Sequence, residues 1–370
     1  ALLCAIVLAV FFTTLKNDFV NWDDVQYVLS NPALRGSWLD ALGFSPGYYH
    51  PLTTLTYKLD FVLFGLNTAM YHFTSLMLHL AACLSAFYLL TALGADRRAA
   101  FIGALMFGIH PVHVEPVAWV SGRKELLWSV FSIWTLISYL KFLDTQLKRF
   151  FFYSLAFFIL AVLSKPFALV LPLLILLTDH YRGRAFNFRL LFEKAPYVVI
   201  ALSLLTLSTA PSGFLLKTGE TTFSVFRFIS FVFQSAVFYA QKIVVPVNLS
   251  ALYPPLELSR NTAIHFFFLL LAVLAGCGLA KAARRGLPET GLSAAEPPGV
   301  PGTGAKLVFG LGFFLITISP ALIVSPPADR YFYLPALGVF FLYGEFVFRL
   351  HGAFSEFKPA GPASPYSRLL

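Results

Sequence analysis

The chain begins with the apolar run ALLCAIVLAVFFTTL (residues 1–15) and soon continues into FVNWDDVQYVLSNP (residues 19–32). This junction places two neighbouring carboxylates, Asp23 and Asp24, a few residues beyond a membrane-like segment. Carboxylates at such a boundary are costly to desolvate and fill no core volume. The pair is therefore better suited to chemistry, ion binding or contact with water than to packing.

The remainder of the chain is dominated by apolar segments. Apolar residues make up 58% of the sequence and charged residues only 12%, whereas a typical soluble domain carries about 25% charge. Because a helix needs roughly 20 apolar residues to cross a bilayer, we predict an all-α polytopic membrane protein with about ten or eleven spans. After residues 1–15, the apolar runs lie at residues 69–93, 98–120, 126–143, 150–164, 166–178, 195–210, 223–246, 263–280, 307–325 and 331–348.

Basic residues cluster in the short connections between these runs. Lys and Arg concentrate on the cytoplasmic side of membrane proteins, so the formal charge of +9 reflects topology and does not indicate a nucleic-acid-binding face. With these connections inside, residues 16–68 form a first outer loop, and the acidic pair lies on the non-cytoplasmic face. The same rule brings residues 110–124, Lys165 and residues 329–331 to that face. The basic connections are Arg97-Arg98, Lys148-Arg149, residues 182–189 and residues 281–285.

The first outer loop contains an amphipathic pattern. Its apolar residues recur at intervals of three and four, which predicts a helix that lies in the membrane interface. Pro51 suits the first turn of that helix. The alternative is a soluble helix packed on the spans. The apolar positions are Leu52, Leu55, Leu59, Val62, Leu63 and Leu66.

Three further expectations concern the organisation of the chain. Residues 1–350 form one transmembrane domain, in which residues 281–306 are a flexible inner linker rich in Gly and Pro. Residues 223–246 disturb the count of crossings, so we expect a re-entrant or flat segment there, or a different count. Residues 351–370 form a tail that leads to a missing segment, and the first span is expected to be truncated.

The acidic pair is the first candidate for chemistry. Like charges in contact raise each other's pKa, so one carboxylate can act as a base while the other orients a partner. Asp23 and Asp24 are therefore our candidate catalytic residues. The alternative is that they are the ordinary acids of a hydrated loop or of a helix N-terminus.

Four cations share the predicted outer face with the acidic pair. Guanidinium and ammonium groups at a lipid boundary suit a phosphate, whereas each cation taken alone could be an interfacial anchor. Four cations and two acids together favour a polar site. The candidate phosphate-binding residues are Arg123, Lys124, Lys165 and Arg330.

Other polar residues on this face are candidates for lining a substrate pocket. His110 and His113 lie three residues apart with Glu115 nearby, which leaves metal binding open, but the pattern is no recognised zinc signature and we expect neither metal nor cofactor. The sequence also lacks a G-x-x-x-x-G-K-[ST] phosphate loop. The pocket candidates are His50, His110, His113, Glu115, Asp329 and Tyr331.

Taken in order, these motifs resemble the transmembrane-and-tetratricopeptide O-mannosyltransferase family and its bacterial relatives. The resemblance extends from about residue 19 to residue 338. It is carried by Trp22-Asp23-Asp24, Asn31-Pro32, His50-Pro51-Leu52, Leu59-Asp60, Leu63-Phe64-Gly65-Leu66, Tyr71-His72, HPVHVEPVAW (residues 110–119), Ser121-Gly122-Arg123-Lys124, Ser164-Lys165-Pro166, Tyr253-Pro254, Asp329-Arg330-Tyr331 and Leu334-Pro335.

The resemblance implies a GT-C-type glycosyltransferase fold. It also implies an inverting transfer of a sugar, mannose in the characterised members, from a polyprenyl or dolichyl phosphate to a Ser or Thr hydroxyl of an acceptor protein. By that resemblance Asp23-Asp24 is the catalytic site, and the four cations are our inference for the donor phosphate. The family's repeats of about 34 residues are not seen in this chain.

Two other classes of function remain. A transporter or flippase for a lipid-linked sugar shares the inner charges and the discontinuous spans around Lys165-Pro166. A scaffold would leave Asp23-Asp24 free to be neutralised without effect. The expected partners are membrane lipid, the lipid-linked sugar and a protein or peptide acceptor. The expected location is a bacterial plasma membrane, or the endoplasmic reticulum membrane if the source is eukaryotic.

Overall fold

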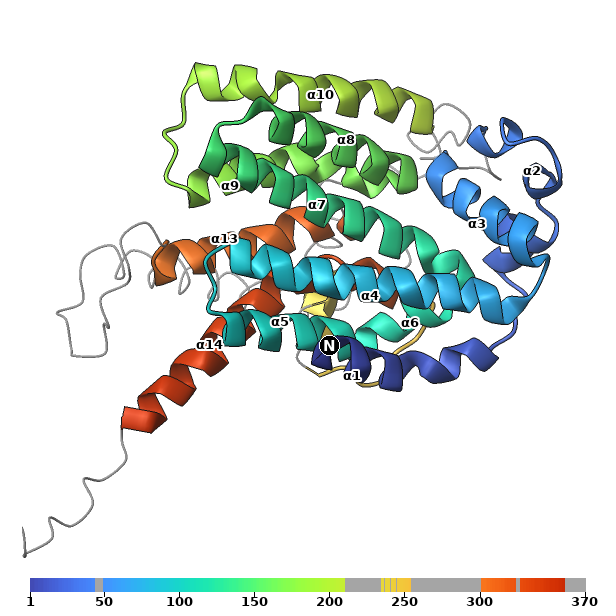
Figure 1. Cartoon of the computed structure of the whole chain (residues 1–370), viewed down its shortest axis with the longest axis horizontal. Coiled ribbons are helices and arrows are strands. Elements are labelled where there is room, and N and C mark those ends of the chain that lie inside the picture. Colours follow the sequence, from blue (N-terminus) through green and yellow to red (C-terminus); the bar gives the residue numbers. More distant parts are fainter. Residues whose placement is uncertain are drawn as a thin grey trace, which may run out of the picture.

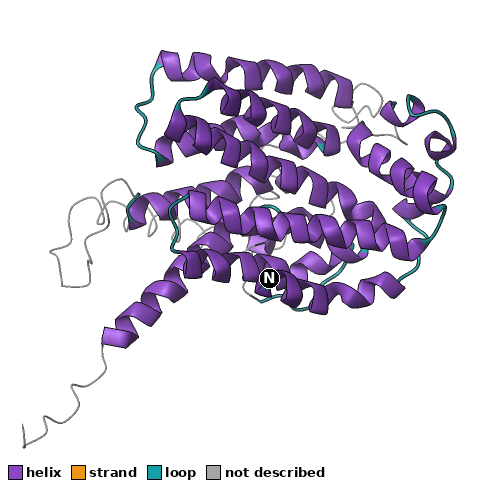
Figure 2. Ribbon diagram, viewed as in Figure 1, coloured by secondary structure: helices purple, strands orange, loops and turns teal. Residues whose placement is uncertain are grey.

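The computed structural model describes residues 1–43, 49–209, 234–235, 237–239, 241–243, 245–253, 301–323 and 327–356. Within these residues the regular structure is entirely helical (Figure 2). The predicted all-α class is therefore confirmed. The expected spans at 263–280, the linker at 281–306 and the end of the tail fall wholly or largely outside the described residues, as does most of residues 223–246.

The long helices lie alongside one another in a bundle (Figure 1). Helix α7 packs against α8 and α4, while α5 packs against α4 and α14. Gly103 permits the close approach of α5 and α14, since a Cβ there would lie 2.8 Å from the Phe340 carbonyl oxygen. The long helices are α1 (Leu2–Phe11), α4 (Thr68–Ala92), α5 (Arg97–Ile109), α7 (Arg123–Thr145), α8 (Lys148–Ser164), α9 (Leu171–Tyr181), α10 (Phe188–Thr209), α13 (Thr303–Ile318) and α14 (Ala336–Glu356).

Two helical segments in the described residues are long and apolar enough to cross a membrane, Thr68–Ala92 and Val120–Thr145. A third span is possible if Arg97–Ile109 and Pro111–Ala118 are counted together, although they are bent by 51°. Shorter apolar helices occupy Leu2–Lys16, Pro166–Tyr181 and Thr303–Ile318. The membrane class is thus supported, and the number of ten or eleven spans stays a prediction.

The apolar run at residues 98–120 is broken at the start of residues 110–124, the stretch predicted to turn at the outer face. Helix α5 ends at Ile109, and η4 (Pro111–His113), α6 (Val114–Ala118) and η5 (Val120–Gly122) follow. The break has a local cause, because Pro111 lacks a backbone N–H and disfavours helical geometry in the residue before it. His110 accordingly takes an extended conformation (φ −65°, ψ 132°).

A second break separates the two short runs around Lys165, as predicted. Helix α8 ends at Ser164, and the chain continues through η6 (Pro166–Val170) into α9. Lys165 itself is extended (φ −159°, ψ 131°). Both breaks turn the backbone at residues that the sequence had singled out as polar.

The first outer loop caps one end of the bundle, at the right of Figure 1. After η1 (Phe12–Lys16), which ends where the loop begins, it contains the π-helical turn η2 (Val25–Leu29), α2 (Pro32–Arg35), η3 (Asp40–Leu42) and α3 (Pro51–Phe64). Helix α3 begins at Pro51, as predicted. The C-terminal part of the chain adds η7 (Ala321–Ile323) and η8 (Asp329–Phe332).

Helix α3 turns its polar side chains inward. Thr53, Lys58 and Asp60 are buried, whereas Leu59 and Leu63 are exposed. The Lys58 ammonium donates hydrogen bonds to the carbonyls of Ala33, Leu34 and Gly36, and so satisfies the C-terminal end of α2. Ionisable residues that face the protein interior, with apolar residues outward, are the arrangement expected of a helix that contacts lipid.

Candidate active site at the start of helix α7

Both oxygens of the Asp24 carboxylate accept hydrogen bonds. Its Oδ1 accepts hydrogen bonds from the Ser121 backbone N–H (2.9 Å) and from the Ser121 hydroxyl, and its Oδ2 accepts one from the Val20 N–H (3.0 Å). The side chain is buried. Asp24 therefore anchors the first outer loop to η5, immediately before helix α7.

Asp23 has a looser environment. Its side chain is 30% exposed, and its Oδ2 lies 3.8 Å from the Lys124 Nζ. Among the residues that the structure describes, no side chain or backbone group donates a hydrogen bond to this carboxylate. The neighbouring Trp22 stacks on Trp119, with ring centroids 5.6 Å apart. Asp23 is thus held in place through its neighbours while its own oxygens stay available.

Lys124 stands between Asp23 and two aromatic rings. Its Nζ lies 4.9 Å from the Tyr27 ring centroid and 5.8 Å from that of Trp119. Ammonium groups are attracted to the faces of such rings. At 3.8 Å its ion pair with Asp23 is longer than a hydrogen bond, so this cation can accept another anion.

Arg330, which belongs to η8, lies beside the same Trp119 ring as Lys124. Its guanidinium forms an ion pair with Glu115 (2.6 Å) and its backbone N–H donates to the other Glu115 oxygen (2.7 Å). The guanidinium carbon also lies 5.3 Å from the Trp119 ring centroid. The break at Pro111 is what brings Glu115 to this position, because α6 starts a new direction after it.

Lys165 approaches from the break between α8 and η6. Its Nζ forms a 2.5 Å ion pair with Glu125 and lies 3.6 Å from the Phe167 ring centroid and 4.9 Å from that of Tyr331. Burial lowers the pKa of Lys165 to about 8, opposed by Glu125 and reinforced by the nearby charges of Lys124 and Arg330. Tyr331 lies beside both Lys165 and Arg330, and Trp119 lies beside both Arg330 and Lys124. Three of the four predicted cations therefore share one aromatic lining.

Arg123, the fourth predicted cation, is enclosed in protein. Its guanidinium forms a 2.6 Å ion pair with Asp60, donates to the Tyr71 carbonyl (2.8 Å), and is fully buried. Its guanidinium carbon also lies 4.7 Å from the Tyr57 ring centroid. Burial raises the pKa of Asp60, and the adjacent Arg123 charge opposes that rise. The pair ties α3 to α7 and leaves Arg123 no open face.

The histidine candidates are all buried, in different surroundings. His113 Nδ1 lies 2.6 Å from the Phe107 carbonyl oxygen, and His110 Nε2 lies 3.2 Å from the Ile243 carbonyl oxygen. His50 packs edge-on against Tyr27, and neither of its ring nitrogens has a hydrogen-bond partner among the residues that the structure describes. Burial and the nearby Lys124 charge lower the pKa of His50 to about 3, so the ring is neutral.

The last two candidates flank Arg330. Asp329 accepts hydrogen bonds from the Tyr253 hydroxyl (2.9 and 3.0 Å) and from the Ser250 N–H (3.0 Å), and so fixes η8 to residues 250–253. Tyr331 lies with its ring near both Lys165 and Arg330. Within the described ranges, no group of three or more His, Cys, Asp and Glu residues is arranged to hold a metal ion.

The arrangement therefore joins one available carboxylate to three cations. Asp23, Lys124, Lys165 and Arg330 form what we call the site cluster, which is lined by Trp119 and Tyr331. Such a cluster can accept a proton and stabilise a phosphate.

Sequence reasoning did not select four residues that shape the site. These are Ser121, Glu125, Asp60 and Trp119, which engage Asp24, Lys165, Arg123 and Lys124. Three of them lie within the motifs at residues 110–125, so the signal was present in sequence. The partners of Ser121, Glu125 and Asp60 could not be assigned because they come from segments at least 40 residues away in the chain.

Comparison with known proteins identifies relatives of one kind. The chain is 34% identical to the protein O-mannosyl-transferase TMTC3 of Mus musculus over 154 residues, which is 38% of this chain and 16% of that protein. It is 27% identical to the protein O-mannosyl-transferase F38B6.6 of Caenorhabditis elegans over 261 residues, 65% of this chain and 36% of that protein. Mouse TMTC2 is 32% identical over 155 residues, 38% of this chain and 18% of the relative.

These relatives confirm the resemblance to the TMTC-type proteins. The chain spans well under two thirds of their length. No family model matches the chain, and no solved structure matches it.

Proposed function

We propose that this chain is a GT-C-type glycosyltransferase that moves mannose from a polyprenyl or dolichyl phosphate to a protein Ser or Thr hydroxyl, with inversion. The observation that carries the proposal is the site cluster, in which the Asp23 carboxylate lies beside Lys124 while Arg330 and Lys165 gather around the same aromatic lining. The protein O-mannosyl-transferase names of the relatives support the same class of reaction.

In this proposal Asp23 is the catalytic base and Asp24 positions it. The oxygens of Asp24 already accept three hydrogen bonds, whereas those of Asp23 are available to a substrate. The acceptor hydroxyl gives its proton to the Asp23 carboxylate as its oxygen attacks the anomeric carbon. A base must come within hydrogen-bonding reach of that proton, and the partial exposure of the Asp23 side chain supports its assignment to this role.

The cations of the site cluster act on the other side of the reaction. As the bond between the anomeric carbon and the phosphate oxygen breaks, the phosphate leaves with the electron pair. Lys124, Lys165 and Arg330 stabilise the charge that develops on it. Glu115 and Glu125 hold two of these cations in fixed positions, so little reorganisation is needed when the donor binds.

The donor and the active-site face follow from the membrane character of the chain. A polyprenyl phosphate keeps its sugar phosphate at the lipid boundary, where the breaks at His110 and Lys165 bring charged groups. We place this boundary on the non-cytoplasmic side, because the basic connections lie at the opposite ends of the helices. The bacterial plasma membrane is the compartment that we favour.

A transfer assay with labelled polyprenyl-phosphate mannose tests the proposal. The purified chain is incubated in detergent with Ser- and Thr-containing peptides, and wild type is compared with Asp23→Asn and with Asp144→Asn. Asp144 is an exposed acid at the other end of α7 and provides a control for loss of one carboxylate. We expect label in peptide with wild type and with Asp144→Asn only.

The other outcomes are equally informative. Equal transfer by all three proteins would contradict the role of Asp23. A wild-type protein that labels no peptide but moves the labelled donor across a vesicle membrane would make the chain a transporter. Broken helices are a feature of transporters too, so both readouts belong in the experiment.

A further inference from the structure

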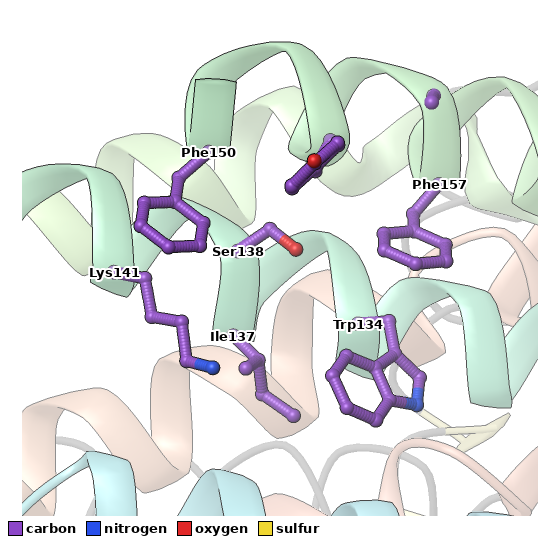
Figure 3. A pocket seen from close by; sticks show the side chains of 8 residues that line it. Trp134, Ile137, Ser138, Lys141, Phe150 and Phe157 are labelled. Carbon is purple, nitrogen blue, oxygen red and sulfur yellow. The ribbon is translucent and has the colours of Figure 1, made fainter. Parts of the chain in front are cut away.

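A groove lies between helices α7 and α8, away from the site cluster (Figure 3). It has a volume of about 350 Å³. The side chains of Lys141 and Ser138 reach into it from α7, and the rings of Phe150 and Phe157 border it from α8. The lining residues are Trp134, Ile137, Ser138, Lys141, Phe150, Tyr153, Ala156 and Phe157.

Lys141 is a cation without a carboxylate partner in the part of the chain that the structure describes. Its Nζ lies 5.3 Å from the Tyr88 ring centroid and 5.8 Å from that of Phe150, so two aromatic faces hold it. The nearby Asp144 pairs with Arg182 instead. A partly buried ammonium group that contacts only rings has capacity for an anion.

The rest of the groove suits a hydrocarbon chain. Trp134 lies at the far end, with its ring 5.9 Å from that of Phe157 and 6.2 Å from that of Tyr88. Trp134 and Lys141 are seven residues apart on α7, which corresponds to about 10 Å along the helix axis. The groove therefore has a charged end at Lys141 and an aromatic end, separated by a length that accommodates part of an acyl chain.

We propose that this groove binds an anionic glycerophospholipid from the leaflet next to the basic connections. The lipid phosphate contacts the Lys141 ammonium and the Ser138 hydroxyl, and one acyl chain lies along Trp134 and Phe157. Lys148 and Arg149 begin α8 at the same end and add to the attraction for an anionic headgroup. Because Lys141 lies near the opposite end of α7 from Asp23, this inference is independent of the proposed catalytic activity.

Native mass spectrometry of the intact chain tests the proposal. The chain is released from micelles that contain phosphatidylglycerol or phosphatidylcholine with identical acyl chains, and retained lipid is counted. We expect wild type to retain phosphatidylglycerol about fivefold better than phosphatidylcholine. Lys141→Gln should lose this preference and Lys141→Arg should keep it. Equal retention of the two lipids by wild type would overturn the proposal.

Two controls separate the groove from general charge. Arg189→Gln removes a positive charge from the exposed start of α10 and should leave the preference unchanged. Ala156→Phe fills the groove from its exposed α8 wall and should reduce retention of phosphatidylglycerol. A preference that survives both Lys141→Gln and Ala156→Phe would place the lipid elsewhere. Displacement of the phospholipid by an equimolar polyprenyl phosphate would assign the groove to that lipid and would equally overturn the proposal.

Discussion

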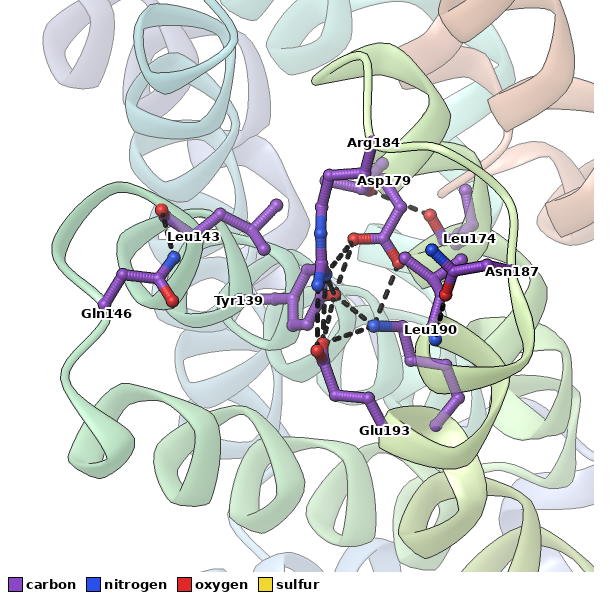
Figure 4. A network of polar contacts seen from close by, with 11 residues as sticks. Tyr139, Leu143, Gln146, Leu174, Asp179, Arg184, Asn187, Leu190 and Glu193 are labelled. Atoms are coloured by element: carbon purple, nitrogen blue, oxygen red, sulfur yellow. Dashed lines mark hydrogen bonds and ion pairs between the residues drawn. The ribbon is translucent and has the colours of Figure 1, made fainter.

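The two ends of helix α7 carry similar charged residues in different states. At its C-terminal end, Tyr139, Asp179, Arg184, Glu193 and Lys194 form a network that we call the clamp (Figure 4). Asp179 pairs with Arg184 (2.7 Å) and with Lys194 (2.9 Å), and it accepts a hydrogen bond from the Tyr139 hydroxyl (2.7 Å). At the N-terminal end, the Asp23–Lys124 pair is 3.8 Å long and partly exposed.

The tighter pairing in the clamp indicates a structural role, and the looser pairing in the site cluster indicates a reactive one. Two acids and two cations balance in the clamp, and each charge has an opposite charge within 3.0 Å. Such groups join α7, α9 and α10 and have no capacity for a further ligand. In the site cluster, by contrast, the loosest pair contains the residue that we assign as the base. A group that must exchange partners during a reaction cannot be held as tightly as one that only joins helices.

The largest effect is expected from neutralising the two neighbouring acids in turn. Asp23→Asn should lower kcat by about 10²–10⁴-fold because it removes the base, without changing the unfolding temperature. Asp24→Asn should lower both kcat and the unfolding temperature, because its amide N–H would face the Val20 backbone N–H, which donates to Asp24 in the wild type. Transfer rates and thermal unfolding in detergent measure the two quantities. Wild-type kcat in Asp23→Asn would remove the distinction between the two acids.

The next effect concerns the clamp. Asp179→Asn leaves two buried or partly buried cations with one acid, and we expect a loss of about 3–5 kcal/mol in the free energy of unfolding. The kcat of the folded fraction should stay unchanged. Asp144→Asn is the matched control, because its pair with Arg182 is exposed and is worth at most about 1 kcal/mol. Equal stability of the two variants in denaturant titrations would show that the clamp is not structural.

A smaller effect is expected from removing cations of the site cluster. Lys124→Gln and Arg330→Ala should each raise the KM for the lipid-linked donor by about 10–100-fold, the range expected for a lost hydrogen bond to a charged group. The KM for the peptide acceptor should change less. Lys194→Gln, in the clamp, should lower stability and leave the donor KM as it is. An unchanged donor KM in Arg330→Ala would exclude Arg330 from the phosphate site.

The smallest effect, about tenfold at pH 9, is a dependence on pH. Burial lowers the pKa of Lys165 to about 8, so this ammonium loses its proton as the pH rises through that value. The donor KM should therefore rise about tenfold per pH unit above pH 8, if the charge is required. In Lys165→Arg the profile should stay flat, because a guanidinium remains charged. Parallel profiles of the two proteins between about pH 7 and pH 10 would disprove the requirement.

Much of the fold could be predicted from local pattern. Apolar runs predicted helices, Pro51 predicted the start of α3, and Lys165-Pro166 predicted the corner between α8 and η6. Composition marked residues 98–120 as one apolar run, whereas the charge rule predicted a turn at residues 110–124, and α5 ends at Ile109, where that turn begins. Because the effect of Pro111 is local, it locates the end of α5 more sharply than composition over a long window does.

Within the candidate site, the sequence alone determined which kinds of groups gather at one end of the helices. Charge placement and motif order brought Asp23, Lys124, Lys165 and Arg330 to one predicted face. Only the tertiary structure decided which residue of an adjacent pair stays open to a ligand. Asp23 and Lys124 stay open, whereas their neighbours Asp24 and Arg123 are held by buried partners. Consecutive helical residues point about 100° apart, so one faces distant segments that bury it while its neighbour faces the open site.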